Sequence, residues 1–328
     1  MIKDSFSDSK EVFEYLLTLD NIIIFTHEHP DGDAIGSVFA LQKALKALGK
    51  TADVYFPESL PMRYSDIVNE NTYITNGREN YNYSVCVSLD CGTFERLETF
   101  DKRKPLNIPI LNIDHHQDNT LFGTHNFIDL TASATAEIIF DILMSAGEEK
   151  ITGDIGDCLL IGIMLDTGGL RFDNTNANIL RKVARLIDLG ANYSQIVKNM
   201  YFTKPLGVMT LESEVILEHI KITCNGKFAY AYLSENLLNK HKIKYRDTEG
   251  TIDYIRTING LTIVAIISKN KDGFRVSLRS NNPDYPVSTI AQEMSGGGHK
   301  LAAGCTIRVN TIEEAEKILL EKVSSVFK

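Results

Sequence analysis

Histidine and aspartate residues follow an apolar run near the start of the chain, in the stretch IFTHEHPDGDAIGS. His27, Asp31 and Asp33 stand close together in this stretch. A polar turn would explain the pattern without any chemistry, because Pro-Asp-Gly-Asp is strong turn sequence. Imidazole nitrogens and carboxylate oxygens are also ligands of divalent metal ions. The rest of the chain must distinguish a turn from a metal site.

Three further acidic or histidine groups occur along the chain. Asp90 follows the run SVCVSL, Asp114-His115-His116 begins where PILNI ends, and Asp166 ends the apolar segment 153–165. Each group alone is an ordinary turn or helix cap. Together, crowded carboxylates repel one another unless a cation or proton lies among them. Mixed carboxylate and imidazole ligands favour a pair of Mn²⁺-like ions over Mg²⁺, and Asp90 is suited to bridge such a pair.

The elements that would position these groups alternate between strands and helices. Strand-like runs occupy 21–26, 52–56, 84–89 and 109–113, and helical patterns occupy 10–19, 34–48, 133–146, 153–165, 176–189 and 193–200. This alternation predicts an α/β fold with a doubly wound, mostly parallel sheet and helices on both faces. Ligands of such sheets bind at the carboxyl ends of the strands, where three of the groups would lie. Ser133 and Thr135 are predicted to cap a helix.

A change of pattern near 201–207 (YFTKPLG) predicts a second domain. A helix is expected at 208–220, followed by strand-like runs at 228–233, 262–268, 274–280 and 305–309 and a final helix at 311–327. These patterns indicate a smaller C-terminal α/β domain with a mixed sheet. The expected boundaries are 1–203 for the first domain, 204–220 for a connecting helix and 221–328 for the second domain.

The composition restricts the partners and the compartment. The 328 residues carry a formal net charge of −9. Proteins that bind long nucleic acid are usually basic, so no long nucleic acid is expected, whereas a small anion near bound metal ions is compatible with this charge. Five cysteines without a CxxC pair favour a reducing cytoplasm. The polar start of the chain and the lack of an apolar run of about 20 residues predict a cytoplasmic protein that does not enter membranes.

The motifs HEHPDGDAIGS, SLD, DHH and LDTGG, in this order, resemble the four motifs of the DHH phosphoesterase superfamily. SLRSNNPD and SGGGHKLAAG resemble its associated C-terminal domain, so the resemblance spans about residues 20–310. The two-domain layout resembles the branch of bifunctional oligoribonucleases (nanoRNases) and pAp phosphatases. The resemblance implies hydrolysis of short oligonucleotides or linear dinucleotides such as pApA to mononucleotides, or of 3′-phosphoadenosine 5′-phosphate (pAp) to AMP. Attack by a hydroxide held by two divalent ions is implied, with Mn²⁺ favoured and Mg²⁺ or Co²⁺ as alternatives.

The resemblance also implies a role for each matching position. One ion would be held by His27, Asp31 and Asp90, and the second by Asp33, Asp90, His115 and Asp166. His116, together with the bridging Asp90, would be catalytic, and His29, where the family often has Asn, would be structural. The substrate would be bound by Arg279, Ser280, Gly296, Gly297, Gly298, His299, Ala303 and Gly304. Glycines allow backbone N–H groups to approach a phosphate closely, and Ser295 stands where relatives often have a further glycine.

Other interpretations stay open at this point. A cyclic dinucleotide phosphodiesterase would use the same metal core. A RecJ-like single-strand exonuclease would need more domains and a basic, aromatic strand-binding surface. An inorganic pyrophosphatase or polyphosphatase would need a different C-terminal domain. A noncatalytic nucleotide-binding sensor would be expected to lack some of the ligands, whereas all are present. The resemblance further suggests a homodimer formed through the N-terminal domain.

Overall fold

The first half of the chain forms a parallel sheet. The computed structural model describes residues 6–64, 68, 72–75, 82–101 and 106–327, which divide into two units, Met1–Thr203 and Lys204–Lys328. The strands of the first unit are β1 (Ile22–Phe25), β2 (Ala52–Val54), β3 (Val85–Leu89), β4 (Ile110–Asp114) and β5 (His125–Ile128). They lie in the order β2-β1-β3-β4-β5, and every neighbouring pair is parallel. The predicted parallel sheet is confirmed, whereas β5 was not predicted because HNFI is short and weakly apolar.

Both faces of this sheet are buried, which explains the unbroken apolar run of β1. Ile22 and Ile24 belong to the large core that includes the helices of this unit. Ile23 and Phe25 point to the opposite face, where a second cluster of apolar and aromatic side chains covers the sheet. Successive side chains of a strand alternate between faces, so a strand that is covered on both sides is apolar throughout.

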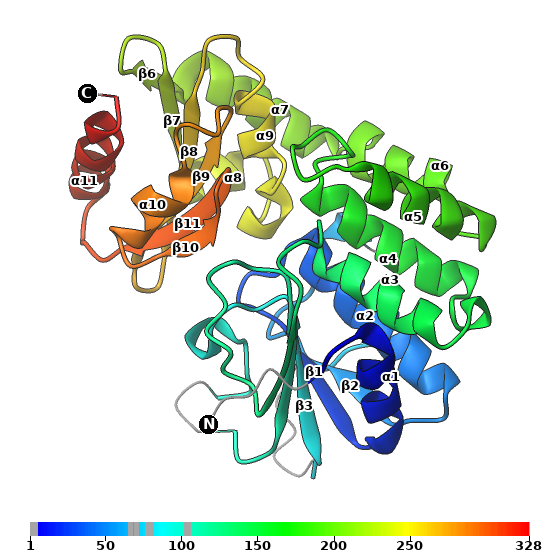
Figure 1. Ribbon diagram of the computed structural model, residues 1–328. Coiled ribbons are helices and arrows are strands. Elements are labelled where there is room, and N and C mark those ends of the chain that lie inside the picture. Colours follow the sequence, from blue (N-terminus) through cyan, green and yellow to red (C-terminus); the bar gives the residue numbers. More distant parts are fainter. Residues whose placement is uncertain (1–5, 65–67, 69–71, 76–81, 102–105, 328) are drawn as a thin grey trace. The chain divides into compact units, whose positions relative to one another are not determined.

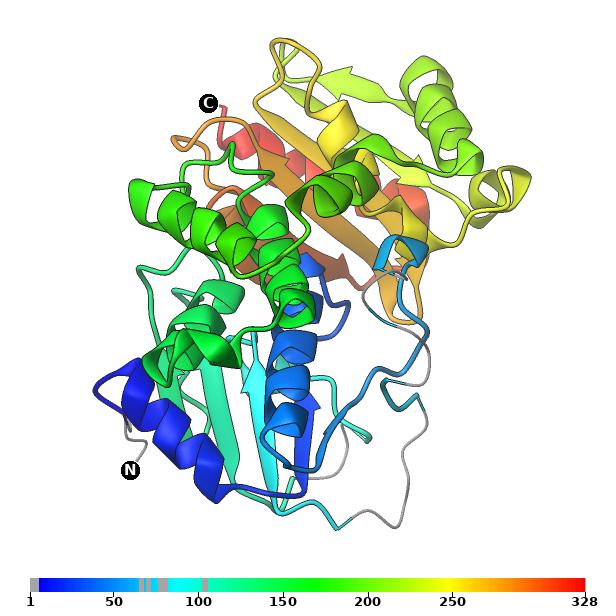
Figure 2. The ribbon, with the colours of Figure 1, turned by 90° about the vertical axis from the view of Figure 1, so that its right-hand side faces the viewer.

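Helices of the first unit pack tightly against one another. They are α1 (Ser9–Thr18), α2 (Gly32–Ala47), α3 (Thr135–Ser145), α4 (Gly153–Asp166), α5 (Ala177–Asp188) and α6 (Tyr193–Val197), with short helices η1 (Met62–Tyr64), η2 (Phe94–Arg96) and η3 (Glu148–Lys150) and the π-helix η4 (Lys198–Phe202). Helices α2 and α4 lie side by side (Figures 1 and 2). At their crossing, a Cβ atom on Gly36 would lie 2.4 Å from the carbonyl oxygen of Cys158. Glycine therefore permits the close approach of the two helices.

The second unit contains a mixed six-stranded sheet. Its strands are β6 (Lys221–Thr223), β7 (Phe228–Leu233), β8 (Ile263–Asn270), β9 (Gly273–Ser280), β10 (Gly297–His299) and β11 (Ala302–Ile307). The order is β10-β11-β9-β8-β7-β6, in which β7 and β8 are parallel and the other neighbours antiparallel. The predicted mixed sheet of the C-terminal part is thereby confirmed.

Helices cover both faces of this second sheet. They are α7 (Leu206–Glu214), the π-helix η5 (Val215–His219), α8 (Glu235–Lys240), η6 (Tyr245–Thr248), α9 (Thr251–Ile255), α10 (Val287–Gln292) and α11 (Ile312–Ser325). Figure 1 shows α7 and α11 on opposite sides of the sheet, and they belong to separate apolar clusters.

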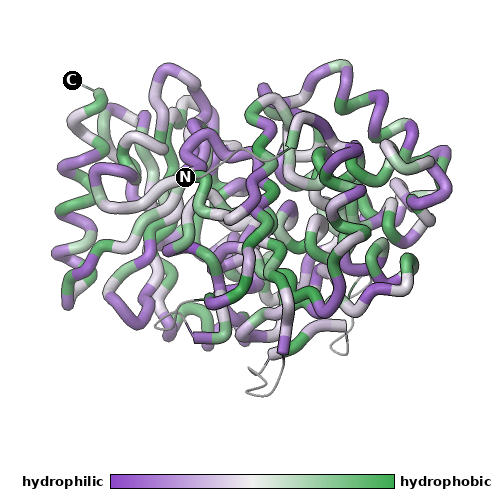
Figure 3. The backbone as a smooth tube through the Cα atoms, turned by 60° about the horizontal axis from the view of Figure 1, so that its bottom comes forward, coloured by the Kyte–Doolittle hydropathy of each residue, from purple (hydrophilic) through white to green (hydrophobic). Residues whose placement is uncertain are grey.

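The last helix shows how its sequence determines its start and its buried face. Thr311 and Glu314 form a capping box at the start of α11. Ala315, Leu319 and Val323 follow at four-residue spacing and are fully buried. The tube leading to the C-terminus accordingly alternates between apolar green and polar purple in Figure 3. In the described part of the chain, every helix is too short or too polar to span a bilayer.

Candidate metal centre

The strand order places a ligand-binding position between β1 and β3. The chain runs from β1 to β2 on one side of β1 and then returns to β3 on its other side. In open parallel sheets, the crevice at such a reversal, at the carboxyl ends of the strands, is where ligands bind. His27 lies two residues beyond β1, Asp90 directly follows β3, and Asp114 is the last residue of β4. The three segments thus deliver their polar side chains to one sheet edge.

Helix α2 brings two more carboxylates to this edge. Asp31 is its N-cap residue, and Oδ1 of Asp31 accepts hydrogen bonds from the backbone N–H groups of Asp33 and Ala34 at 3.1 and 3.2 Å. Asp33 follows in the first turn and is buried. The predicted polar turn therefore leads directly into α2, and it places Asp31 and Asp33 two residues apart at the start of the helix. His29 is exposed in the same turn with φ of 57°.

One group of ligand atoms surrounds His27. Its Nε2 lies 3.9 Å from Oδ1 of Asp31 and 3.6 Å from Oδ2 of Asp90. The ligand atoms of these three residues lie within 4.8 Å of one another.

A second group surrounds His115. Its Nε2 lies 3.8 Å from Oδ2 of Asp33 and 3.7 Å from Oδ1 of Asp90. Asp166, at the C-terminal end of α4, places Oδ2 at 3.7 Å from the same nitrogen. Asp90 thus takes part in both groups, with one carboxylate oxygen toward each.

Backbone carbonyl groups fix the orientation of both imidazoles. Nδ1 of His27 lies 2.8 Å from the carbonyl oxygen of Glu28, and Nδ1 of His115 lies 3.2 Å from that of Ala132. A carbonyl oxygen only accepts, so each Nδ1 must carry the proton. In the neutral ring this leaves the Nε2 lone pair directed at the carboxylates, which is how metal-binding histidines are usually prepared.

The carboxylates of the centre stabilise positive charge on the histidines. Burial opposes the charged form of His27, but the carboxylates of Asp31 and Asp90 raise its pKa to about 10. Burial likewise opposes protonation of His115, whose pKa is raised to about 9 by Asp166, Asp33 and Asp90.

Two of the carboxyl groups have raised pKa values for the same reason, an excess of negative charge in the centre. Burial, followed by the negative charge of Asp90, raises the pKa of Asp33 well above its usual range. Burial, together with the charges of Asp31 and Asp90, raises the pKa of Asp166 to about 6. A positive charge among these groups would lower both pKa values.

The spacing of the donors fits divalent ions. Two atoms that are each about 2.1 Å from one ion lie roughly 3.0 Å apart when adjacent and about 4.2 Å apart when opposite. The separations of 3.6–3.9 Å between the histidine nitrogens and the carboxylate oxygens fall inside this range and exceed ordinary hydrogen-bond lengths. The mixed oxygen and nitrogen donors suit Mn²⁺ and related ions. The residues present therefore fit a metal site.

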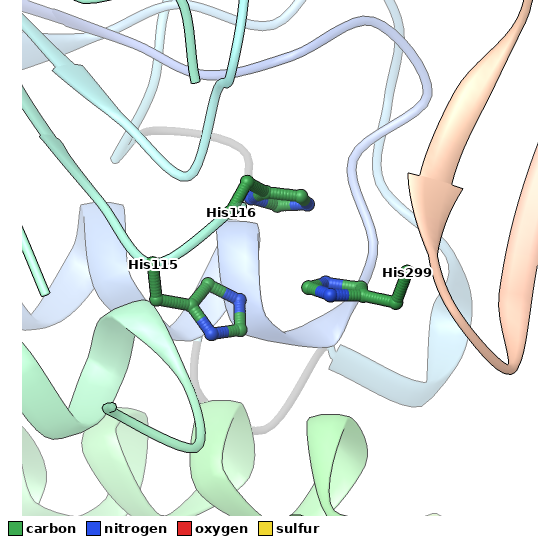
Figure 4. Close-up of side chains that lie close together, drawn as sticks. All are labelled: His115, His116 and His299. Atoms are coloured by element: carbon green, nitrogen blue, oxygen red, sulfur yellow. The ribbon is translucent and has the colours of Figure 1, made fainter. Parts of the chain in front are cut away.

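His116 is arranged differently from the other two histidines. Its Nδ1 lies 2.7 Å from Oδ1 of Asp114, a carboxylate at a strand end with no exposed surface. Oδ2 of Asp114 accepts a hydrogen bond of 2.6 Å from Nδ2 of Asn119. Burial opposes the charged form of Asp114, but the charge of His116 prevails and lowers the pKa of that carboxyl. Figure 4 shows the rings of His115 and His116 projecting from the turn that follows β4.

The backbone at Asp90 is held in an uncommon conformation. Asp90 has φ of 56°, in the left-handed region. Aspartate tolerates this region better than most residues, but the conformation still costs on the order of 1–2 kcal/mol. Such strain persists where the surrounding structure requires it, and it is concentrated at functional sites.

The predicted substrate-binding residues of the second unit lie on three neighbouring strands. Ala302 of β11 pairs with Arg279 of β9 on one side and with His299 of β10 on the other. The same ladder pairs Gly297 with Gly304 and Gly298 with Ala303. Ser280 ends β9 and is buried, and Gly296 packs closely against the backbone of Gly304. The eight residues predicted from the two C-terminal motifs therefore come together within this unit.

Arg279 and the glycine segment have specific local geometry. Nε of Arg279 lies 3.6 Å from Oδ1 of Asp253, and its Nη1 donates to the carbonyl oxygen of Leu278. Ser295 has φ of 58° and Gly298 has φ of 133°. The positive φ of Ser295 is a conformation that glycine adopts without strain.

Sequence reasoning missed a polar contact of the centre and the true start of α3. Thr135 was predicted as a helix cap, but the N-cap of α3 is Ala134, and the Thr135 hydroxyl donates to Oδ1 of Asp90 at 2.9 Å. Ser133 does not cap α3 either, because its hydroxyl donates to the carbonyl oxygen of Asn174. The only signal was the polar segment TASATAE before an apolar helix, which is ordinary cap sequence.

Comparisons with known proteins agree with the motifs. Residues 21–163 match the DHH family, N-terminal domain, and residues 225–327 match the DHHA1 domain. The Thermus thermophilus protein called bifunctional oligoribonuclease and PAP phosphatase NrnA is 32% identical over 302 residues, covering 92% of this chain and 89% of the relative. The Bacillus subtilis protein of the same name is 28% identical over 317 residues, covering 95% and 96%.

A solved structure shares the fold. The crystal structure of an exopolyphosphatase-related protein from Bacteroides fragilis has a TM-score of 0.84 at 24% identity, covering 97% of this chain and 96% of that one. The ordered motifs, the two domain matches and the relative at 32% identity lead to one conclusion. This chain belongs to the DHH family of phosphoesterases, with a DHH domain followed by a DHHA1 domain.

Proposed function

We propose that this chain is a phosphoesterase dependent on two divalent ions that hydrolyses short oligonucleotides to mononucleotides and releases phosphate from pAp. The observation that carries the metal part is the pair of carboxylate–imidazole groups that share Asp90 at the β1/β3 reversal. The substrate class is supported by the names of the two relatives that align over most of this chain.

Six side chains would hold the two ions in this proposal. They are His27, Asp31 and Asp90 for one ion, and Asp33, Asp90, His115 and Asp166 for the other. When bound, such a pair lowers the pKa of water and neutralises charge on phosphoryl oxygens. Mn²⁺ is favoured because imidazole belongs to both sets, with Mg²⁺ and Co²⁺ as alternatives.

His116 would act on the substrate rather than on an ion. Its Nδ1–H points at Asp114, and Nε2 would be the atom that exchanges a proton or a hydrogen bond with a phosphate oxygen. The Asp114 carboxylate would fix the ring orientation and stabilise the protonated ring, as the carboxylate does in other carboxylate–histidine pairs.

The second unit would supply the phosphate grip. Arg279 can donate two parallel hydrogen bonds to a phosphate, and the glycine segment 296–298 exposes backbone N–H groups without side-chain hindrance. His299 adds a further donor. We propose the domain roles accordingly: a catalytic domain at 1–203, a connecting segment at 204–220 and a substrate-binding domain at 221–328. A homodimer is proposed as well, and light scattering on the purified chain would measure its mass.

A hydrolysis panel tests the proposed activity. With Mn²⁺, RNA of two to five nucleotides, pApA and pAp should be cleaved, and long single-stranded DNA should be cleaved far more slowly. Cyclic di-AMP and pyrophosphate in the same panel separate the proposal from the alternative substrates. Chelation with EDTA should abolish every reaction, and Asp90→Asn provides the control for contaminating nucleases. The proposal fails if the wild-type protein cleaves none of the short substrates with any divalent ion, or if D90N cleaves them equally well.

A further inference from the structure

The start of helix α3 contacts the carboxylates of the candidate metal centre. The backbone N–H of Thr135 donates to Oδ2 of Asp33 at 2.6 Å, and the N–H of Ala136 donates to Oδ1 of Asp33 at 2.9 Å. The hydroxyl of Thr135 donates to Oδ1 of Asp90 at 2.9 Å. Thr135 itself has no exposed surface. A single residue therefore binds the proposed bridging carboxylate and one carboxylate of the second ion.

The local sequence explains why these donors are directed at the centre. The N-cap residue Ala134 has only a methyl side chain, so it cannot accept from the first-turn N–H groups. Asp33, from the start of α2, takes that place with both carboxylate oxygens. The carboxylate of Glu137 accepts from the backbone N–H of Ser133 and from Nζ of Lys182, which holds this end of α3 in position.

The Thr135 hydroxyl contacts the carboxylate that faces both histidines. Oδ2 of Asp90 faces Nε2 of His27 at 3.6 Å, and Oδ1 faces Nε2 of His115 at 3.7 Å. A carboxylate can bridge two sites only when its plane is oriented so that each oxygen points to one of them. The hydroxyl bond to Oδ1 opposes rotation of that plane about the Cβ–Cγ bond. The same residue has an uncommon backbone conformation, with φ of 56°, of the kind that is concentrated at functional sites.

Helix α4 leaves room for this arrangement. A Cβ atom at Gly162 would lie 2.5 Å from Cβ of Ala136 and 2.8 Å from Oδ1 of Asp33. Glycine at this position lets the first turn of α3 reach Asp33.

We propose that Thr135 is a positioning residue that presets the Asp90 carboxylate for two ions and, through its backbone, holds Asp33. The inference rests on the metal site in the proposed function. Partners that orient metal ligands contribute about 10–100-fold to metal affinity when measured by mutation. Removing the hydroxyl should therefore weaken Mn²⁺ binding without removing a ligand.

The test compares Thr135→Val with Thr135→Ser and Thr131→Val. Valine keeps the branched shape and the backbone N–H but removes the hydroxyl, whereas serine keeps the hydroxyl. Thr131 is the matched control, because its hydroxyl also donates to a carboxylate, that of Asp129, in an exposed position outside the centre. Titration calorimetry with MnCl₂ on the EDTA-treated full chain measures the affinity, and thermal unfolding without metal measures folding. T135V should bind Mn²⁺ about 10–100-fold more weakly, while T135S and T131V stay within about 3-fold of wild type.

The outcomes separate this inference from the metal proposal. Wild-type affinity in a folded T135V overturns the role of Thr135 and leaves the metal site intact. A wild-type chain that binds no divalent ion overturns both. If T135V does not fold, the Mn²⁺ affinities of Thr135→Ala and T135S are compared instead, since these variants are smaller and differ only in the hydroxyl. Equal Mn²⁺ affinities of T135A and T135S would overturn the inference. A weakened T135S contradicts it as well, because the hydroxyl is then not the group that matters.

Discussion

His116 and Asp114 form a pair whose function can be tested separately from metal binding. In Asp114→Asn the side chain facing Nδ1 of His116 is neutral and can present either an oxygen or an NH₂ group. The ring therefore loses its fixed tautomer and its negative counter-ion. We expect kcat for pAp or pApA to fall by about 10²–10⁴ while KM and the Mn²⁺ affinity change little. Steady-state kinetics with calorimetry would measure the three quantities.

A double mutant provides the control for this pair. If Asp114 acts through His116, adding D114N to His116→Ala should cost almost nothing further in kcat. Additive losses would show that Asp114 acts by another route.

Arg279 tests the phosphate grip. Its guanidinium is partly buried and lies beside Asp253. Arg279→Ala should raise KM for pAp by about 10–100-fold, since a charge-assisted hydrogen bond contributes roughly 1.5–3 kcal/mol. Arg308→Ala is the matched control. Arg279 lies opposite the first residue of β11, whereas Arg308 is exposed just after the last residue of that strand. An equal KM in both variants would remove Arg279 from substrate binding.

At the level of single residues, the sequence identified the candidate metal ligands but not the residues that hydrogen-bond to them. Ordered motifs at strand ends are enough to identify His27, Asp90 and His115 as candidates, because parallel strands bring their C-terminal residues to one edge of the sheet. The contact from Thr135 to Asp90 joins residues that are far apart in the sequence. Nothing in a short polar segment indicates which distant carboxylate its hydroxyl will meet.

Among the elements, the α2–α4 crossing has the tightest requirement. In Gly36→Ala the new Cβ would lie 2.4 Å from the carbonyl oxygen of Cys158 and 2.7 Å from N of Gly162, so the helices must separate. We expect a loss of about 1–3 kcal/mol or more in the free energy of unfolding, measured by urea denaturation.

Two further glycines sharpen this prediction. Gly162→Ala should weaken Mn²⁺ binding in addition to stability, because its Cβ would press on Oδ1 of Asp33. Gly250→Ala is the control, since a Cβ there would meet no atom within 4 Å. If G36A and G250A unfolded at the same urea concentration, the crossing would not be tightly packed.

Glu214, the last residue of α7, lies among basic side chains that should make the stability of the fold depend on pH. A hydrogen bond from Lys240 lowers the pKa of Glu214, and burial opposes this effect. With further hydrogen bonds from His241 and His219, the pKa falls to about 2. A carboxyl whose folded pKa is below its ordinary value of about 4.5 stabilises the fold above that pH. This contribution is lost as the pH falls toward about 2.

The variant Glu214→Gln removes this titrating group. Between pH 5 and 2.5 the thermal midpoint of wild type should therefore fall more steeply than that of E214Q. Glu321→Gln, at an exposed position of α11, should keep the wild-type slope. Parallel curves for wild type and E214Q would contradict the prediction.

The elements themselves were largely predictable, whereas their order was not. The apolar run of β1 and the spacing of the buried residues in α11 follow directly from strand and helix periodicity. Strand β5 was missed because two of its four residues are His and Asn. The order β2-β1-β3-β4-β5, which creates the reversal beside β1, depends on packing among all the helices and is not encoded in any one segment.

For the whole molecule, metal ions should stabilise the two units unequally. The six proposed ligands all belong to the first unit. Mn²⁺ at about 100 times its dissociation constant should add about 2.7 kcal/mol to the free energy of unfolding of the unit that binds it. Hydrogen exchange should show slower exchange in α2, α3 and β3 and little change in β8 and β9, and EDTA should reverse the effect. Equal slowing in both units would contradict the assignment.

The spread of the proposed ligands along the chain has a consequence for biosynthesis. From residue 27 to residue 166 there are 166 − 27 = 139 positions. At about 5–20 residues per second, a ribosome takes about 7–28 s to cover them. Within this interval Asp33 and Asp90 are added first, and from residue 90 onward the nascent chain lacks only His115 and Asp166 of the proposed ligands, together with the helix that ends in Asp166. Because α4 brings both the last carboxylate and the glycine surface on which α2 packs, the ion-binding set and the α2–α4 contact are completed together, about halfway through the synthesis of the 328 residues.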